Sequence, residues 1–300
     1  MIETLVCAVS SGSDRIDVLR FPSLERVRLC STGDTPMTAV AVAADLIAVG
    51  CSDGAEVRLH HAVSGATERV LPAERGAAGL ACAPSRGLLF VANEFANSVT
   101  VYDTSTWARR GRLETGRGPC EVLATPDERL LLVSNEESND LSVYDLQQQE
   151  LIGAVRIPDG PLGLDCSADS RWALVGSFLA PTVTLVDLDR LSVTAERMVG
   201  SLHIGVRLLP DGERALVTDS EWDTLTVVRL PDLRPVSRIT VGAGPAMVAI
   251  TPDGCSALVT NRCDDSVSLV DLDRSREVHR APVGLSPTGV VLITIPGEQG

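Results

Sequence analysis

The sequence predicts an all-β fold, a seven-bladed β-propeller with four antiparallel strands per blade, closed by pairing N-terminal strands with the C-terminal strand. The first observation is an aspartate that follows an apolar run at intervals of 42 residues or a multiple of 42, at Asp103, Asp145, Asp187 and Asp271. The second is another aspartate with the same period, found in short polar turns at Asp127, Asp169, Asp211 and Asp253. The third is apolar alternation with the period of two that is typical of strands, with no helical periodicity.

Each repeat predicts four strands in a fixed order. The first strand follows a Gly-Pro pair such as Gly118-Pro119, and the second ends at Asn93, Asn135 or Asn261. The third is an alternating segment such as NSVTVYD, and the fourth returns to the next glycine. The chain is then one domain, 1–300, with six complete blades at 34–74, 75–116, 117–158, 159–200, 201–242 and 243–284.

The two ends of the chain predict the seventh blade. Residues 286–294 match the first strand of the preceding repeat, while residues 4–10, 15–21 and 25–31 match the other three strands. Neither end is a whole blade, so 1–33 and 285–295 are expected to share one sheet. Their pairing removes the exposed edges of an open array.

The repeat motif resembles that of the YVTN family of β-propeller proteins. The residues concerned are LVTN at 258–261 with its variants FVAN and LVSN, the TPDG turn at 251–254, and DSVSLVD at 265–271. The resemblance spans essentially the whole chain, although Ser10 and Cys51 replace the asparagine in the first two blades. It implies the fold, while the functions it implies range over ligand-binding proteins, surface proteins, lactone hydrolases and streptogramin-type lyases.

Composition excludes several classes of function. A formal charge of -14 and a pI near 4.7 argue against nucleic acid and membrane surfaces as partners. The sequence contains no lysine, which excludes Schiff-base chemistry and a phosphate-loop lysine. The first ten residues lack the basic start of a secretory signal, and the eight cysteines form no C-x-x-C pair, so we expect a cytoplasmic protein with reduced thiols.

The binding face is expected where the loops entering the first strands and those joining second to third strands gather, because these loops differ between repeats. Glu121 is the lone charge in a ring of small residues that also includes Met247, and these small residues are expected to hold the channel open. Cys51, Cys120 and Cys263 lie on the same face but in separate blades, so we predict no metal-ligand set.

Blade six departs most from the repeat. His203 stands where other blades have proline, and Asp219 stands where neighbours have asparagine, followed by Glu221 and Trp222. With Glu121 these residues predict an acid-base group that could also hold Mg²⁺ or Ca²⁺, with Trp222 as a stacking wall. Alternatively, His203 is an exposed turn residue, Asp219 only replaces asparagine as a turn former, and Glu121 caps backbone amides.

Further ligand-binding candidates come from the loops between second and third strands. Phe95, Phe178 and Trp222 suit an apolar or planar ligand, although packing between loops explains them equally. Arg262 is a cation within an acidic rim that includes Glu136, Glu94 and Glu137; it could orient a carboxylate or form an internal salt bridge. The rim itself could be merely solvated.

Two functions follow as expectations. The first is a non-catalytic propeller that binds a small molecule or a peptide in the funnel. The second is an enzyme, a lyase, isomerase or hydrolase in secondary metabolism, that uses the His/carboxylate group in the same funnel. A G-x-S-x-G match at 50–54 falls in a hairpin turn, and so does not predict a hydrolase elbow.

Overall fold

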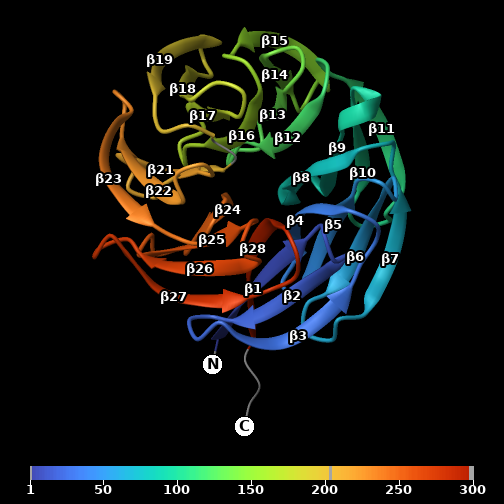
Figure 1. The fold of residues 1–300 in the computed structure, drawn as a ribbon. Helices are drawn as coiled ribbons and strands as arrows, with labels where there is room; N and C mark the ends of the chain where they lie inside the picture. The colour runs from blue at the N-terminus through green and yellow to red at the C-terminus, as the bar shows by residue number, and fades with distance from the viewer. Residues whose placement is uncertain (1, 203–204, 297–300) are drawn as a thin grey trace.

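Figure 1 shows the computed structural model of the chain, a ring of seven sheets around a central axis. It describes residues 2–202 and 205–296. Each sheet has four antiparallel strands, so the predicted seven-bladed propeller is confirmed. Among the described residues no helix has the length and apolar character needed to cross a membrane.

The blades are numbered from the one that contains the N-terminus, and each is given from its innermost to its outermost strand. Blade one contains β28 (Pro287–Pro296), β1 (Ile2–Ser10), β2 (Arg15–Arg20) and β3 (Glu25–Ser31). Blade two contains β4 (Pro36–Ala43), β5 (Leu46–Cys51), β6 (Glu56–His61) and β7 (Thr67–Pro72). Blade three contains β8 (Ala77–Ala83), β9 (Leu88–Asn93), β10 (Ser98–Asp103) and β11 (Arg109–Glu114), with 3-10 helices at Pro84–Arg86 and Glu94–Ala96.

The other four blades follow in chain order. Blade four contains β12 (Pro119–Ala124), β13 (Leu130–Asn135), β14 (Asp140–Asp145) and β15 (Glu150–Arg156). Blade five contains β16 (Pro161–Cys166), β17 (Trp172–Ser177), β18 (Thr182–Asp187) and β19 (Ser192–Met198). Blade six contains β20 (Val206–Leu208), β21 (Arg214–Asp219), β22 (Thr224–Arg229) and β23 (Arg234–Thr240). Blade seven contains β24 (Pro245–Ile250), β25 (Ser256–Asn261), β26 (Ser266–Asp271) and β27 (Arg276–Pro282).

Blade one closes the ring as predicted. Strands β28 and β1 pair in antiparallel register from Ile2 with Pro296 to Ser10 with Pro287, so the first and last strands of the chain lie in the same blade (Figure 1). A β-strand alone leaves unpaired backbone groups along its edge, and this pairing satisfies them.

The hydrophobic core lies between neighbouring blades rather than within one. One cluster joins Leu132 and Ile157 of blade four to Val175 of blade five, all fully buried, and similar clusters occur around the ring. The second and third strands of each blade supply most of these side chains, whereas the outermost strands are largely exposed. Burial at about 25 cal/mol per Å² of apolar surface therefore fixes each blade against the next.

A recurring hydrogen bond between residues 21 positions apart, called the latch below, links successive blades. The side chains of Asn97, Asn139, Asp223 and Asp265 each accept a hydrogen bond from the backbone N–H of the residue 21 positions later, at 2.8 to 2.9 Å. Each of these residues has a φ of +51° to +59°, the left-handed region that asparagine and aspartate tolerate best. The latch holds the loop between second and third strands close to the entry of the next innermost strand.

The recurring aspartates are turn residues. Asp145 accepts the N–H groups of Gln147 and Gln148 at 2.8 and 2.9 Å, and Asp169 accepts the N–H of Arg171 at 3.1 Å. These are local Asx turns, which explains why the aspartates recur in phase.

Candidate functional site

Two cavities lie along the axis of the ring. The mouth pocket, of about 230 Å³, opens among the loops between second and third strands. The channel cavity, of about 620 Å³, reaches Pro84, Pro210 and Pro252 in the turns of the opposite face. Glu121, Thr38 and Met247 line both, and therefore mark the level at which the two cavities meet.

The mouth pocket brings together five of the residues that the sequence singled out. The innermost strands supply Glu121 and Met247, and loops between second and third strands supply Glu136, Phe178 and Arg262. Phe178 and Met247 give the pocket apolar surface. Arg262 donates to the Ser286 hydroxyl at 3.5 Å and forms no ion pair within the described ranges, 2–202 and 205–296. The internal salt bridge considered for Arg262 is therefore not present among these residues.

Glu121 lies in β12, where its backbone is fixed by the Ser134 hydroxyl, which accepts from the Glu121 N–H at 3.2 Å. Within the described part of the chain, its carboxylate makes no hydrogen bond or ion pair. Loss of water around this carboxylate raises its pKa to about 7; Arg207 opposes the shift and the negative charge of Asp165 adds to it. The expected role of Glu121 as a cap for backbone amides is thus not observed, and the group exchanges a proton near neutral pH.

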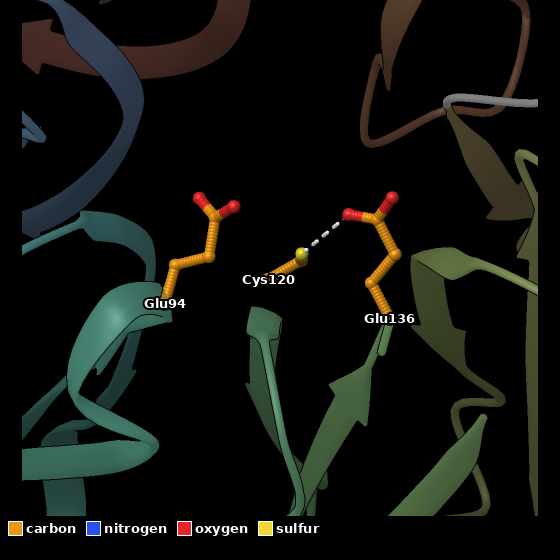
Figure 2. A group of neighbouring side chains, drawn as sticks. All are labelled: Glu94, Cys120 and Glu136. Carbon is orange, nitrogen blue, oxygen red and sulfur yellow. Dashed lines mark hydrogen bonds between the residues drawn. The ribbon is translucent and has the colours of Figure 1, made fainter. Parts of the chain in front are cut away.

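Cys120 precedes Glu121 in β12 and lies between two acidic side chains, Glu94 and Glu136. Figure 2 shows Glu94, Cys120 and Glu136 pointing toward one another from blades three and four, above the ends of the strands. The Cys120 thiol donates to the Glu136 carboxylate at 3.3 Å, and one potential ligand atom from each of the three lies within 4.8 Å of the others. Burial raises the pKa of the thiol well above its ordinary value, and Glu136 and Glu94 add to the shift. The thiol is therefore the donor to Glu136.

Glu94 experiences the same crowding of negative charge. Burial raises its pKa, and the carboxylates of Glu136 and Glu137 raise it further. Within the acidic rim, Glu94 is thus partly desolvated, whereas Glu137 is exposed. The set of two carboxylates and one thiol could hold a cation, although a thiol suits a borderline ion such as Zn²⁺ better than Mg²⁺ or Ca²⁺.

Three of the blade-six candidates, Asp219, Glu221 and Trp222, do not line this pocket. Asp219 is fully buried and accepts the N–H groups of Ser201 and Trp222 at 2.9 and 3.3 Å, so it forms its own loop. Glu221 contacts the Ser201 hydroxyl. Trp222 is 48% exposed and stacks on Arg238, with 4.8 Å between the guanidinium carbon and the ring centroid. His203 lies outside the described residues, so its predicted role stays a prediction.

Phe95 also points away from the mouth pocket. It is 56% exposed and lies 5.8 Å from the guanidinium carbon of Arg75. Of the three loop aromatics, only Phe178 lines the pocket.

The ring of small residues has a role different from the one expected. A Cβ added to Gly79 would lie 2.5 Å from the Cys120 carbonyl oxygen, and one added to Gly205 would lie 2.5 Å from the Ala246 carbonyl oxygen. Such approaches are too close for any side chain. Gly79 and Gly205 therefore let neighbouring innermost strands pack together, whereas Gly289 of the same ring lines the channel cavity.

The sequence reasoning missed two charged residues near the channel. Arg207 in β20 lines the channel cavity. Asp165 in β16 lies close enough to Arg207 for the charge of the arginine to act on the pKa of the aspartate. The sequence could have revealed both, because they are charged at a repeat position that is aliphatic in the other blades. The residues at that position are Ala39, Ala81, Leu123, Ala249 and Val291.

Comparisons with known proteins agree with this architecture. The model of a family described as lactonase, 7-bladed beta-propeller, matches residues 45–153, a little over a third of the chain. No curated protein matches the sequence. The chain is thus a member of the seven-bladed β-propeller class, on the combined evidence of this match and the ring of seven sheets.

Solved structures with the same fold differ widely in what they do. A protein titled as functionally unknown, from Desulfotomaculum acetoxidans, is similar at a TM-score of 0.85 with 10% identity, covering 96% of this chain and 98% of that one. Hydrazine synthase of Kuenenia stuttgartiensis is similar at a TM-score of 0.78 with 18% identity, covering 85% and 88%. The dihydro-heme d1 dehydrogenase NirN is similar at 0.67 with 15% identity; the match covers 93% of this chain but only 63% of NirN. At these identities the likeness shows the fold alone.

Proposed function

We propose that the protein binds a small organic molecule with a positive charge in the mouth pocket. The observation that carries the proposal is the excess of carboxylates there: among the described residues, Glu94, Glu121 and Glu136 line the pocket against one cation, Arg262. Like charges in a partly dehydrated pocket repel one another, and a bound cation removes that repulsion.

The size and the apolar surface of the mouth pocket limit the class of ligand that it can bind. Cavities for drug-sized ligands span about 300–1,000 Å³. A pocket of about 230 Å³ suits a smaller molecule. Phe178 offers an aromatic ring, which attracts an alkylammonium group, and Met247 offers a flexible apolar side chain that can pack against its alkyl part.

Calorimetry with a panel of small primary, tertiary and quaternary amines tests the proposal, with neutral isosteres of each amine as controls. Charged members should bind, and Glu136→Gln and Glu94→Gln should each weaken binding about tenfold. The matched control is Glu150→Gln, an exposed glutamate on the outermost strand β15. Equal affinity for amines and isosteres would contradict the proposal, as would an effect of Glu150→Gln as large as that of Glu136→Gln.

Zn²⁺ forms a separate arm of the same experiment. If Zn²⁺ binds to the wild type with an affinity that Cys120→Ser abolishes, and no amine binds, the occupant of the pocket is a metal ion and the amine proposal fails. Binding of amines that survives in Cys120→Ser supports the proposal.

A second candidate function is the hydrolysis of a cyclic ester. The lactonase family model covers Glu121, and this carboxylate exchanges a proton near neutral pH. Ionised Glu121 would take a proton from water, whose oxygen attacks the ester carbonyl carbon. The tetrahedral adduct would then collapse, the bond from the acyl carbon to the ring oxygen would break, and the ring oxygen would recover the proton, giving a hydroxy acid.

Incubation with γ- and δ-lactones, followed by measurement of acid release, tests this second candidate. We expect the rate to rise with pH to a plateau, with a midpoint near 7, and to fall at least a hundredfold in Glu121→Gln. Turnover that is unchanged in Glu121→Gln would exclude Glu121 as the base.

The cellular compartment forms part of the proposal. All eight cysteines are free thiols, which supports a reducing compartment such as the cytoplasm.

A further inference from the structure

The channel cavity has chemistry that differs from that of the mouth pocket. Most of its wall is aliphatic, from Ala39, Ala81, Leu123, Ala249 and Val291. Of the charged residues in the described part of the chain, Glu121 and Arg207 alone line it. It therefore offers one anion and one cation on an apolar background, in a volume of about 620 Å³.

The Arg207 side chain is held in place from one side. Its Nη1 donates to the Leu164 carbonyl oxygen at 3.0 Å and to the Val206 carbonyl oxygen at 2.9 Å. The guanidinium thus extends over blade five, and no residue of β16 lines the channel cavity. Within the described ranges, its Nε and Nη2 atoms make no hydrogen bond, so the edge of the guanidinium that binds a carboxylate with two parallel bonds has no protein partner there.

Arg207 is not neutralised by direct ion pairs. Among the described residues, neither Glu121 nor Asp165 lies within 4.0 Å of it, although its charge acts on the pKa of both. The Asp165 carboxylate instead accepts the Leu208 N–H at 2.6 Å, which fixes it behind Arg207. Opposite charges that share a lumen without pairing leave room for a ligand that pairs with each.

We propose that the channel cavity is a second binding site, for a small aliphatic zwitterion of the α-amino acid type, whose carboxylate pairs with Arg207 and whose ammonium group pairs with Glu121. The aliphatic walls receive the side chain of the ligand. A simple anion would face repulsion from Glu121 and Asp165, and a simple cation would face repulsion from Arg207. A molecule with both charges satisfies both groups at once.

Titration calorimetry with the twenty common amino acids tests the proposal. For each that binds, the amine without the carboxylate and the acid without the ammonium group are measured beside it. We expect the aliphatic amino acids to bind, and each truncated analogue to bind at least tenfold more weakly. No binding by any amino acid would overturn the proposal. So would amine binding equal to that of the amino acids in Glu136→Gln, a variant in which the mouth pocket is weakened and the channel cavity is intact.

Variants of residues that line the channel cavity test which of them contact the ligand. Arg207→Gln should bring the affinity ratio of amino acid to amine toward one, a change that a purely structural role of Arg207 would not produce. Ala249→Leu fills the cavity without altering a charge and should weaken binding at least tenfold. The control Arg129→Gln, an exposed arginine outside both cavities, should leave binding unchanged.

Retention of the carboxylate preference in Arg207→Gln would also overturn the proposal. If that variant does not fold, Ala249→Leu decides, because undiminished binding in it excludes the channel cavity as the site.

Discussion

Asp169 on the turn face and the pair Glu94 and Glu121 on the mouth face are carboxylates in opposite surroundings. On the turn face, Asp169 accepts from the Ser167 hydroxyl and the Arg171 N–H, and these bonds lower its pKa. On the mouth face, Glu94 and Glu121 have raised pKa values, chiefly because burial removes water from them. A carboxylate that its own turn satisfies is part of the scaffold, whereas a desolvated carboxylate without a partner can receive a ligand.

The largest effect should come from Glu121. Its pKa is higher in the folded state, at about 7 against the ordinary glutamate value of 4.5, so the folded protein binds more protons than the unfolded chain between these values. The charged form therefore lowers stability as pH rises through this window. Glu121→Gln should raise the free energy of unfolding by about 2–3 kcal/mol at pH 8 and by little at pH 4.5. Urea unfolding at both pH values measures this; a loss of stability at pH 8 would contradict it.

A smaller effect of opposite sign is expected on the turn face. Asp169→Ala removes the acceptor of the Ser167 hydroxyl and the Arg171 N–H, and should lower the free energy of unfolding by about 1 kcal/mol at pH 7. The deficit should shrink as pH falls through the lowered pKa of Asp169, because protonation weakens the same bonds in the wild type. Amine binding should stay unchanged. If Asp169→Ala abolished amine binding, the division of roles between the faces would be wrong.

The smallest effect should come from Trp222. Its ring is half-exposed and contacts Arg238 away from the mouth pocket. Trp222→Ala should change the free energy of unfolding by less than about 1 kcal/mol and leave amine affinity within twofold. Phe178→Ala is the matched comparison and should weaken amine binding severalfold. If Trp222→Ala weakened amine binding and Phe178→Ala did not, the amine would bind beside blade six and not in the mouth pocket.

The fold could be predicted in full because each blade repeats its turn chemistry in phase. Asp145 and Asp169 form local turns, and local turns depend on sequence neighbours alone. Once the period is known, the pairing of β28 with β1 follows, since only a blade shared between the two ends leaves no open sheet.

The mouth pocket could be predicted only in part. Glu121 and Met247 lie in innermost strands, where phase determines position, and both line the pocket. Trp222 lies in a loop and Phe95 in the short 3-10 helix Glu94–Ala96, whose conformations the period does not specify; both are exposed and neither lines the pocket. The approach of Glu94 to Cys120 crosses from one blade to the next, a distance that spacing along the chain does not reveal.

Because β28 and β1 pair in one sheet, the chain could be opened at a different point without changing the arrangement of the blades in space. Joining the two ends with a short linker and opening the chain between blades one and two, near Thr32 to Asp34, would give a permuted protein in which every blade is contiguous. Such a molecule would carry its new ends beside β4, where a reporter group could be attached next to the mouth pocket residues Met37 and Thr38.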